Sequence, residues 1–391
     1  MKSAKEIQKE NRVWADDLLT RVTLKMESVT LRLRGVIAGN ASLETGRRAS
    51  DSPSSWTSGF FAGLNWLMYS YTKNEEYRRT AEGLELMLDA GLSSFEKLHH
   101  DVGFMWHISA GASYRLTGNS DSRLRNLYAA ATLSSRYVHG AGFIRAWNNA
   151  WSGNCVDGWS IIDCLMNLPI LFWASDVLGD DRYARIAVSH ADMALEQHMR
   201  PDGSVAHIVE HDRETGEPVA THAGQGYAVG SSWSRGQSWA VYGFVIAYLH
   251  TNDERYLNAA KRVANYFIAN CCDDWLPRVD FRAPSTPVYY DTTAGACAAC
   301  GMIELAKLLP ENEGGMYMNA AISMLSAMTD KFCNFDPECD YILGGGTARY
   351  PIPDVVPIER AGLHIPIIYG DFFYVEALLK LAGSDFNPWL K

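Results

Sequence analysis

The sequence predicts an all-α protein, an (α/α)6 barrel of six helical hairpins in a single domain that spans residues 1–391. Two observations predict this fold. An apolar helix, a short polar turn and a second, more polar helix recur in this order along the chain. In addition, a lone helix near residues 4–34 begins the chain and a lone apolar helix ends it, so these two helices can pair and close a ring.

The hairpin pattern occurs in five full copies, and a truncated sixth copy ends the chain. The full copies are expected at residues 64–84, 108–131, 168–192, 244–267 and 303–325. Their turns contain Gly, Asn, Asp and Pro, the residues that end one helix and cap the next. With the first and last helices, six inner and six outer helices are expected. Strand-like alternation is confined to short loop pieces such as Val205–Val209.

This topology directs the chemistry to one rim of the barrel. The short turns within the hairpins lie on one rim, so the longer connections between hairpins lie on the other. Polar and aromatic candidates fall in those connections or in the first turns after them: Trp56, Asp101, Asp157, Asp163, His207, Gln225, Trp233, Arg235, Trp239, Asp291 and Asp371. Because these segments converge, a ligand pocket is expected at this rim.

Asp163 is the first candidate for a general acid. The segment 154–175 is expected to be largely one apolar helix, and its large residues recur at three- and four-residue steps: Trp159, Ile162, Met166, Ile170 and Trp173. Asp163 lies inside this run, with Asn167 one turn further on the same face. A carboxylate among apolar neighbours must be paired, hydrogen-bonded or protonated, because burial of a lone ion is too costly. The alternative is a structural aspartate that bonds a loop.

Asp101 is the second candidate. It stands just before an inner helix that is expected to begin near Met105, so one interpretation is a helix N-cap. The other interpretation is a partner for Asp163. Two carboxyl groups that face each other in one pocket move their pKa values apart, leaving one as the acid and one as the acceptor.

The segment 231–239 is dense in groups that suit a uronic acid. Trp233 and Trp239 offer flat apolar faces, and Arg235 offers a fork for a carboxylate. The alternative is two core tryptophans and a helix-capping arginine. Upstream, Gln225 lies in a glycine-rich loop and can bond hydroxyl groups. The remaining candidates are His207 and His222, each of which is either structural or functional, and Trp56 and Phe60, which supply an aromatic wall at the first inner helix.

The composition and charge of the chain indicate which binding partners and which cellular compartment to expect. The net charge of -10 and the pI near 5.6 argue against nucleic acid or an anionic membrane as the main partner. No segment has the long apolar run of a membrane span, and the N-terminal segment is charged and amphipathic, unlike a signal peptide. We therefore expect a soluble, cytoplasmic protein that is a monomer or a weak homo-oligomer.

The cysteines and the short motifs favour no metal or cofactor. Cys297 and Cys300 have metal-like spacing, but they lie in an alanine-rich helical run without a second pair, so they are expected to pack in the core. Gly344–Gly346 lacks the Lys-Ser of a phosphate loop, and no serine-hydrolase elbow, HExxH or EF-hand occurs.

Four segments together resemble glycoside hydrolase family 88, the unsaturated glucuronyl hydrolases. They are HDVGFMW (100–106), IIDCLMNLPILFWAS (161–175), WSRGQSWAVYG (233–243) and YGDFFYVEALL (369–379). The resemblance extends from about Trp56 to the C-terminus with these motifs in order, and the (α/α)6 barrel of the family agrees with the helix pattern.

The resemblance implies an exo-acting enzyme on oligosaccharides that polysaccharide lyases leave behind, of glycosaminoglycan type or similar. These carry a 4,5-unsaturated glucuronate at the non-reducing end, which the family releases by hydrating the C4=C5 vinyl ether without a metal. By similarity, Asp163 protonates C4 and helps activate the water that adds at C5, while Asp101 holds sugar hydroxyls and tunes Asp163. The implied substrate contacts are His207, Gln225, Arg235 and Trp239, with aromatic walls from Trp56, Phe60 and Trp233.

Other readings stay open at this point. The two aspartates also fit a conventional inverting glycosidase on saturated sugars. An unsaturated rhamnogalacturonyl hydrolase tends to carry Gly-Asn where this chain has Gly236-Gln237. A carbohydrate-binding toroid without activity and an epimerase that uses His207 and His222 are further alternatives. One departure from the family is the segment 362–368, which lacks the serines that members often place there; His364 is a candidate substitute.

Overall fold

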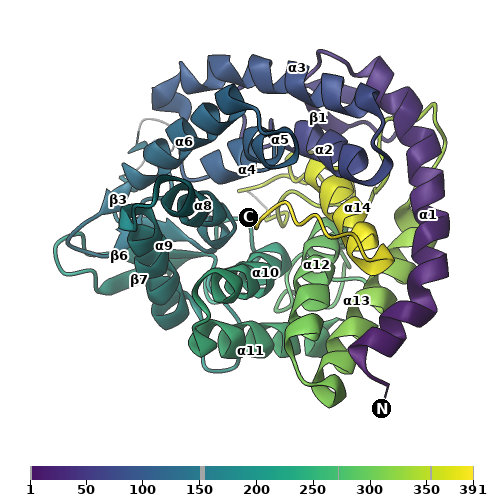
Figure 1. Cartoon of the computed structure of the whole chain (residues 1–391). Coiled ribbons are helices and arrows are strands. Elements are labelled where there is room, and N and C mark those ends of the chain that lie inside the picture. Colours follow the sequence, from purple (N-terminus) through teal and green to yellow (C-terminus); the bar gives the residue numbers. More distant parts are fainter. Residues whose placement is uncertain (1, 150–154, 272, 353–354, 391) are drawn as a thin grey trace.

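Two concentric rings of helices surround a common axis in the computed structural model, which describes residues 2–149, 155–271, 273–352 and 355–390 (Figure 1). The inner ring contains α2 (Phe60–Thr72), α5 (Ala110–Thr117), α8 (Pro169–Leu178), α10 (Ser234–Thr251), α12 (Thr292–Leu308) and α14 (Ile368–Ala382). The outer ring contains α1 (Ala4–Arg32), α3 (Glu75–Leu92), α6 (Ser120–Ser134), α9 (Arg182–Met193), α11 (Glu254–Asn270) and α13 (Glu311–Phe332). The predicted arrangement of six inner and six outer helices is confirmed for the described residues.

The turns within the hairpins follow from local sequence. Gly118, Gly179 and Asn252 adopt the left-handed conformation that ends α5, α8 and α10. Asn119 and Asp253 follow directly, and each side chain accepts a hydrogen bond from a backbone N–H at the start of the next helix. Each inner helix therefore stops and its outer partner starts within two or three residues.

The first and last helices close the ring as predicted. Helix α1 packs against both α13 and α14. The Gln8 side-chain amide donates to the backbone carbonyl oxygens of Lys380 (2.9 Å) and Leu381 (3.2 Å) at the end of α14. Ser3 and Glu6 form a capping box that fixes the start of α1. The two ends of the sequence thus contribute neighbouring parts of one wall.

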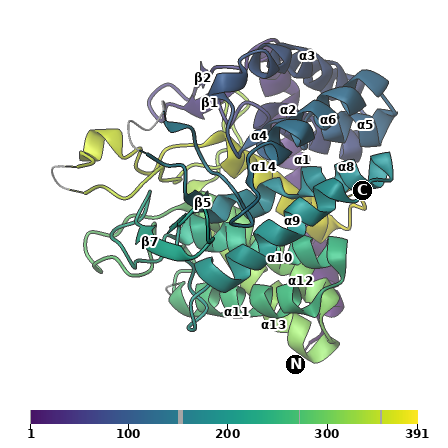
Figure 2. The same ribbon diagram turned by 90° about the vertical axis from the view of Figure 1, so that its left-hand side faces the viewer.

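The remaining elements lie in the connections between hairpins. They are β1 (Ala38–Ala41), β2 (Arg48–Ser50), η1 (Phe95–Lys97), α4 (Val102–Trp106), β3 (Tyr137–Val138), β4 (Phe143–Ile144), β5 (Trp159–Ile161), the 3-10 helix η2 (Ile162–Asn167), the π-helical turn η3 (Ala194–His198), β6 (Ile208–His211), β7 (Pro218–His222) and η4 (Ile358–Arg360). Figure 2 shows the strands and long loops gathered on one side of the barrel, away from the C-terminus. The predicted separation of long and short connections onto two rims is confirmed.

The prediction of one apolar helix through residues 154–175 is wrong. Residue 154 lies outside the described residues, and the rest is strand β5, then η2, then α8. Strand β5 pairs with β6, which pairs with β7, so tertiary strand pairing overrides the helical periodicity of the sequence. Pro169 then occupies the first turn of α8, where a missing backbone N–H costs least. Asp163 consequently lies on a short 3-10 helix at the rim instead of inside a long helix.

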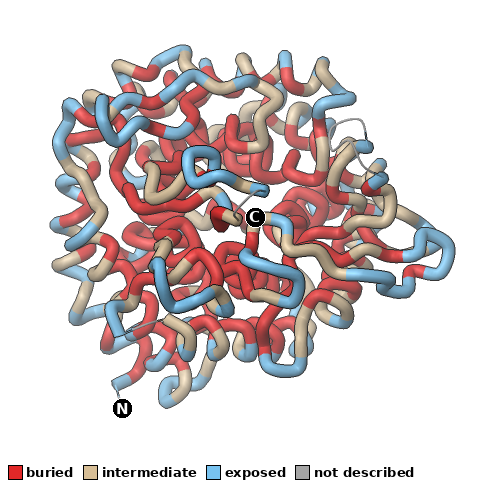
Figure 3. Tube along the Cα trace, turned by 180° about the vertical axis from the view of Figure 1, so that it is seen from behind, coloured by how far each residue is buried: buried red, intermediate tan, exposed pale blue. Residues whose placement is uncertain are grey.

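The inner ring is apolar and almost continuously buried, as the view from behind shows (Figure 3). One large cluster of buried apolar side chains includes residues from all six inner helices. Cys297 and Cys300 are fully buried in it, which confirms that they pack in the core. Among the described residues, none of the helices combines the length and the apolar character that crossing a membrane requires.

Candidate active site

A cavity of about 330 Å³ opens at the rim that carries the long connections. Its lining comes from segments far apart in the sequence: Trp56, His99, His100, Asp101, Trp147, Trp159, Ile161, Asp163, His207, Ile208, Gly224, Gln225 and Arg349. A larger hollow of about 600 Å³ lies between α1, α2 and the end of α14, away from the rim that carries the long connections. The smaller cavity contains the perturbed titratable groups, and it is therefore the candidate active site.

Asp163 is the group in this cavity that is suited to give a proton. Its Oδ1 atom is buried and has no hydrogen-bond partner among the described residues, and it lies 3.6 Å from Nε2 of His207. Burial, the largest cause, and the charge of Asp101 raise the pKa of Asp163 to about 7, although His100 and Arg235 oppose the rise. A carboxyl group with this pKa is partly protonated at neutral pH, which general acid catalysis requires.

Asp101 has the opposite character. It occupies the N-cap position of α4, but its side chain makes no capping hydrogen bond and is directed to other partners. Its Oδ1 atom lies 3.1 Å from Nε2 of His100 and accepts a hydrogen bond from Asn167 (3.1 Å). Burial alone would raise the pKa of Asp101, but the charge and hydrogen bond of His100, with His99 and Asn167, hold it below its usual value. The pair therefore consists of a protonated acid and an ionised acceptor.

The pKa values of the two histidines before Asp101 are shifted in opposite directions. Nδ1 of His100 lies 2.9 Å from the Ala146 carbonyl oxygen, and its Nε2 faces Asp101, so both ring nitrogens face acceptors. Burial opposes the charge on His100, but Asp101 outweighs it and raises the pKa. For His99, burial prevails and lowers the pKa to about 4. Donor atoms of His99, His100 and Asp101 lie within 4.8 Å of one another; we assign none of them as a metal ligand, because these contacts already use His100 and Asp101.

His207 approaches Asp163 as a neutral ring. The backbone N–H of Gln225 donates to its Nδ1 atom (3.1 Å), and an N–H can only donate, so Nε2 carries the proton that faces Asp163. The Ala223 carbonyl oxygen, 3.2 Å from the same Nδ1, is then a contact without a shared proton. Burial lowers the pKa of His207 to about 3. Gly224 has a φ of +59°, and a Cβ atom there would lie 2.2 Å from the His207 ring, so only glycine fits this approach.

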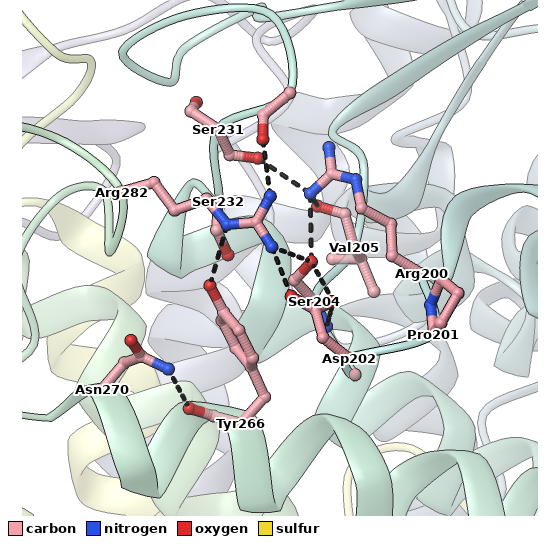
Figure 4. A network of polar contacts seen from close by, with 12 residues as sticks. Arg200, Pro201, Asp202, Ser204, Val205, Ser231, Ser232, Tyr266, Asn270 and Arg282 are labelled. Carbon is pink, nitrogen blue, oxygen red and sulfur yellow. Dashed lines mark hydrogen bonds and ion pairs between the residues drawn. The ribbon is translucent and has the colours of Figure 1, made fainter.

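A polar network joins the segment before β6 to the segment before α10 (Figure 4). The Arg200 side chain donates to the carbonyl oxygens of Ser231 (3.0 Å) and Val205 (3.3 Å). Arg282 donates to the Gly230 carbonyl oxygen (2.8 Å) and to the hydroxyl of Ser204 (3.0 Å). The strand β6 and the start of α10 are thereby fixed to each other.

The structure brings five of the nine predicted site residues to the cavity surface: Trp56, Asp101, Asp163, His207 and Gln225. The other four, Phe60, Trp233, Arg235 and Trp239, lie behind it. Trp239 and Phe60 are fully buried and pack on Phe104, whose ring centroid is 5.7 Å from that of Trp56. The Trp233 ring lies against that of His207, with centroids 4.1 Å apart. These residues support the lining from behind.

The guanidinium group of Arg235 is not free to bind a ligand. Its guanidinium is buried, pairs with Asp291 and donates to the carbonyl oxygens of Thr347 (2.7 Å) and Ala348 (2.7 Å). It also lies over the Trp233 ring, 4.5 Å from its centroid. Arg235 therefore acts as an anchor for the segment that carries Arg349, and its charge lowers the pKa of Asp163 from a distance.

The other sequence candidates have structural contacts. Asp157 pairs with Arg145 (2.6 Å) and Arg213 (3.0 Å). Asp371 forms a buried pair with Arg48 (2.5 Å) and accepts from two backbone N–H groups. Two further histidine candidates also have partners. His222 lies 2.8 Å from Glu210 and stacks on Trp159. His364 accepts a hydrogen bond from the Tyr290 backbone N–H (3.0 Å).

Eight lining residues are not among the site residues predicted from the sequence: His99, His100, Trp147, Trp159, Ile161, Ile208, Gly224 and Arg349. The adjacency of His100 to Asp101 was the available signal for one of them. Trp159 was assigned to a helix core because its apolar spacing resembles a helix. Arg349 had no local signal, since its segment is placed by Arg235, Gln225 and Tyr350 through long-range hydrogen bonds.

Comparisons with known proteins identify the family of this chain. The profile of Glycosyl Hydrolase Family 88 matches residues 39–274. The unsaturated glucuronyl hydrolase of Bacillus sp. (strain GL1) is 35% identical over 342 residues, which cover 85% of this chain and 88% of the relative. The unsaturated chondroitin disaccharide hydrolase of Streptococcus pneumoniae (strain ATCC BAA-255 / R6) is 34% identical over 337 residues, covering 85% of this chain and 83% of the relative.

A solved structure gives the same result at the level of the fold. The crystal structure of the unsaturated glucuronyl hydrolase from Streptococcus agalactiae matches with a TM-score of 0.87 and 28% identity, covering 97% of this chain and 94% of that one. The predicted barrel and the predicted resemblance are both confirmed. The family profile spans more than half of the chain, and each relative covers most of it, so the chain belongs to glycoside hydrolase family 88 and is a glycoside hydrolase.

Proposed function

We propose that this enzyme releases a 4,5-unsaturated glucuronate from the non-reducing end of glycosaminoglycan-type oligosaccharides by hydrating its C4=C5 vinyl ether. The observation that carries the proposal is the pair of unlike carboxyl groups in one cavity, Asp163 with a pKa of about 7 and Asp101 with a lowered pKa. The volume of the cavity, about 330 Å³, suits one terminal sugar better than the middle of a chain.

The reaction follows from these protonation states. Protonated Asp163 gives its proton to C4, and water adds to C5, where positive charge develops. The Asp163 carboxylate then takes a proton from that water, so the acid is restored. The product is a hemiketal at C5, whose ring opens to a ketone. The oxygen freed at C1 completes a hemiacetal that collapses to an aldehyde and expels the leaving sugar as an alcohol.

The other lining residues bind and orient the sugar. Ionised Asp101 accepts hydrogen bonds from sugar hydroxyls, and His100 balances its charge. The side chains of Trp56, Trp147 and Trp159 supply flat apolar faces for the pyranose ring. Neutral His207 directs an N–H group toward Asp163 and can stabilise its carboxylate after proton transfer.

Arg349 contacts the anionic group of the substrate in this proposal. It is exposed and lines the cavity, whereas the guanidinium of Arg235 is fully engaged inside the protein. Gln225 and Arg235 both donate to the Ala348 carbonyl oxygen, and the Tyr350 backbone N–H donates to Gln225 (2.9 Å). The backbone on both sides of Arg349 is therefore fixed, which favours a defined position for its positive charge.

Loss of ultraviolet absorbance from the conjugated double bond tests the proposal. An unsaturated chondroitin disaccharide should lose this absorbance with the wild-type enzyme and keep it with Asp163→Asn. The rate should fall as the pH rises through about 7, because Asp163 must be protonated to act. Release of sugar from a saturated disaccharide without absorbance loss would contradict the proposal and favour a conventional inverting glycosidase. Preference for a rhamnose leaving group would favour the rhamnogalacturonyl alternative.

We also propose that the enzyme works in the cytoplasm as a monomer or weak homo-oligomer. The buried thiols of Cys164, Cys297 and Cys300 are free, as is usual in a reducing compartment. Cell fractionation and sedimentation velocity test these two points.

A further inference from the structure

Asn167 connects the two carboxyl groups of the site without lining the cavity. It ends η2 and is fully buried. Its Nδ2 atom donates to Oδ1 of Asp101 (3.1 Å) and to the backbone carbonyl oxygen of Asp163 (3.4 Å). Its Oδ1 atom accepts from the backbone N–H of Phe104 in α4 (2.8 Å). One side chain thus binds the helix that carries Asp101 and the 3-10 helix that carries Asp163.

The orientation of this amide is determined by the backbone. The N–H of Phe104 can only donate, so the atom that faces it must be the amide oxygen. The amide nitrogen must then face Asp101, and an amide nitrogen can only donate. Asp101 therefore always receives a hydrogen bond from Asn167, and this bond favours the ionised form of Asp101.

The packing between the two elements excludes other side chains of similar chemistry. A Cβ atom at Gly103 would lie 2.7 Å from both Cα and Oδ1 of Asn167, so α4 and η2 are in direct contact. A glutamine at position 167 has no room for its additional methylene group. The short amide and the missing side chain at Gly103 together permit the three hydrogen bonds.

We propose that Asn167 is the positioning residue that keeps Asp101 an ionised hydrogen-bond acceptor and holds it at a fixed distance from Asp163. This inference rests on the proposed function for its catalytic consequence only. An ionised Asp101 is one of the two causes that keep Asp163 protonated. Asn167 therefore acts on the acid through Asp101, although it touches neither the substrate nor the carboxyl group of Asp163.

Several titratable groups act on Asp101 besides the neutral amide of Asn167, and the test must separate their effects from that of the amide. They are His99 and His100 on the same loop, Asp163 and Cys164 on η2, and Arg136 on the segment after α6. A substitution at Asn167 leaves all of these in place. A change in the titration of Asp101 in such a variant therefore reports the amide bond itself.

Carboxyl-carbon NMR titration of protein labelled at aspartate tests the inference without any substrate. The Asp101 signal is identified by its absence in Asp101→Asn. In Asn167→Ala we expect Asp101 to titrate about one pH unit higher or more, since a hydrogen bond to a charged group favours the ionised form about tenfold. Asn167→Asp retains an acceptor for the Phe104 backbone N–H and is the second test variant, to be used if Asn167→Ala does not fold. Its second oxygen faces Asp101, so the shift should be larger.

Asn65 on α2 supplies the matched control. It is also fully buried, donates to the Phe61 carbonyl oxygen (2.8 Å) and accepts from Thr30 (2.9 Å), and neither of these partners in the described part of the chain is a carboxyl group. Asn65→Ala should lower the melting temperature and leave the titration of Asp101 unchanged. Unchanged titration of Asp101 in both folded Asn167 variants would overturn the inference, because Asn167 would then be structural only.

The pH profile of kcat provides the second readout. Asp101 must be ionised, so the acidic limb should move to higher pH in Asn167→Ala. The basic limb belongs to Asp163 and should keep its place, because Asp101 is fully ionised in that range in either protein. A uniform loss of kcat with an unchanged acidic limb would count against the inference. Failure of the wild-type enzyme to consume the unsaturated sugar would overturn the proposed function and leave the NMR result intact.

Discussion

Asp163 illustrates how the burial of one carboxyl group affects stability. Its folded-state pKa of about 7 exceeds the usual value for an aspartate, so the fold prefers the protonated form. The contribution of this proton to stability is complete below about pH 4 and is lost as the pH rises through about 7. Above that range the protein retains a buried carboxylate that Asp101 repels.

Replacing Asp163 by asparagine should therefore stabilise the protein while it abolishes activity. At pH 8 we expect the free energy of unfolding of Asp163→Asn to exceed that of the wild type by a few kcal/mol, and the difference to shrink toward pH 4. Denaturant titrations at the two pH values measure this. Asp157→Asn is the control, since Asp157 is ion-paired with Arg145 and Arg213 and its loss should not stabilise. Equal stability of Asp163→Asn and wild type at pH 8 would contradict the raised pKa.

Arg349 offers a second test at the residue scale. Arg349→Gln should raise KM about tenfold or more with little change in kcat, because a charge-assisted contact to the sugar is lost in both the ground state and the transition state. Arg349→Lys should recover part of the affinity, since it keeps the charge and loses the fork. Arg360→Gln, an exposed arginine of η4 in the same connection, is the matched control. An unchanged KM in Arg349→Gln would show that a residue other than Arg349 binds the anionic group of the substrate.

The helical elements were predictable from sequence, and the details of the site were not. The turns at Gly118 and Asn252 are encoded locally, so the hairpins could be located without a structure. Strand β5 has the apolar spacing of a helix and becomes a strand only because β6 pairs with it, which is a long-range effect. The same reason applies to Arg235. Its sequence context indicates a free fork, but Asp291 and the 347–348 backbone occupy it from other elements.

The buried pair of Arg235 and Asp291 connects three elements and predicts a strong effect of substitution. It joins the first turn of α10, the N-cap of α12 and the segment that carries Arg349. Arg235→Gln leaves Asp291 buried without its counter-ion, so we expect a loss of about 3–5 kcal/mol in the free energy of unfolding. KM should rise as well, because Arg349 loses its anchor. Arg213→Gln, which removes an exposed partner of Asp157, should change neither quantity appreciably.

At the scale of the whole molecule, the C-terminal segment closes the end of the barrel opposite the candidate site. Trp389 is fully buried, and its ring stacks on Phe373 with centroids 5.9 Å apart. Its Nε1 atom donates to the buried carboxylate of Glu376 (3.2 Å). Arg115 donates to the carbonyl oxygen of Pro388 (2.7 Å), which holds the segment across the axis. The C-terminal segment thus seals one end of the barrel, and the candidate site lies at the other.

Trp389→Ala should test whether the sealed end of the barrel and the candidate site are independent, and whether the chain is one domain. The substitution opens a cavity and removes a donor from Glu376, so the free energy of unfolding should fall by about 3–5 kcal/mol. The active-site carboxyl groups are untouched, so the pH profile of kcat should keep both limbs. Because one apolar cluster runs through all six inner helices, we expect the variant to unfold in a single transition, at a lower temperature than the wild type. Two separate transitions by calorimetry would show that the barrel consists of independent units, and a shifted pH profile would show that the seal and the site are coupled.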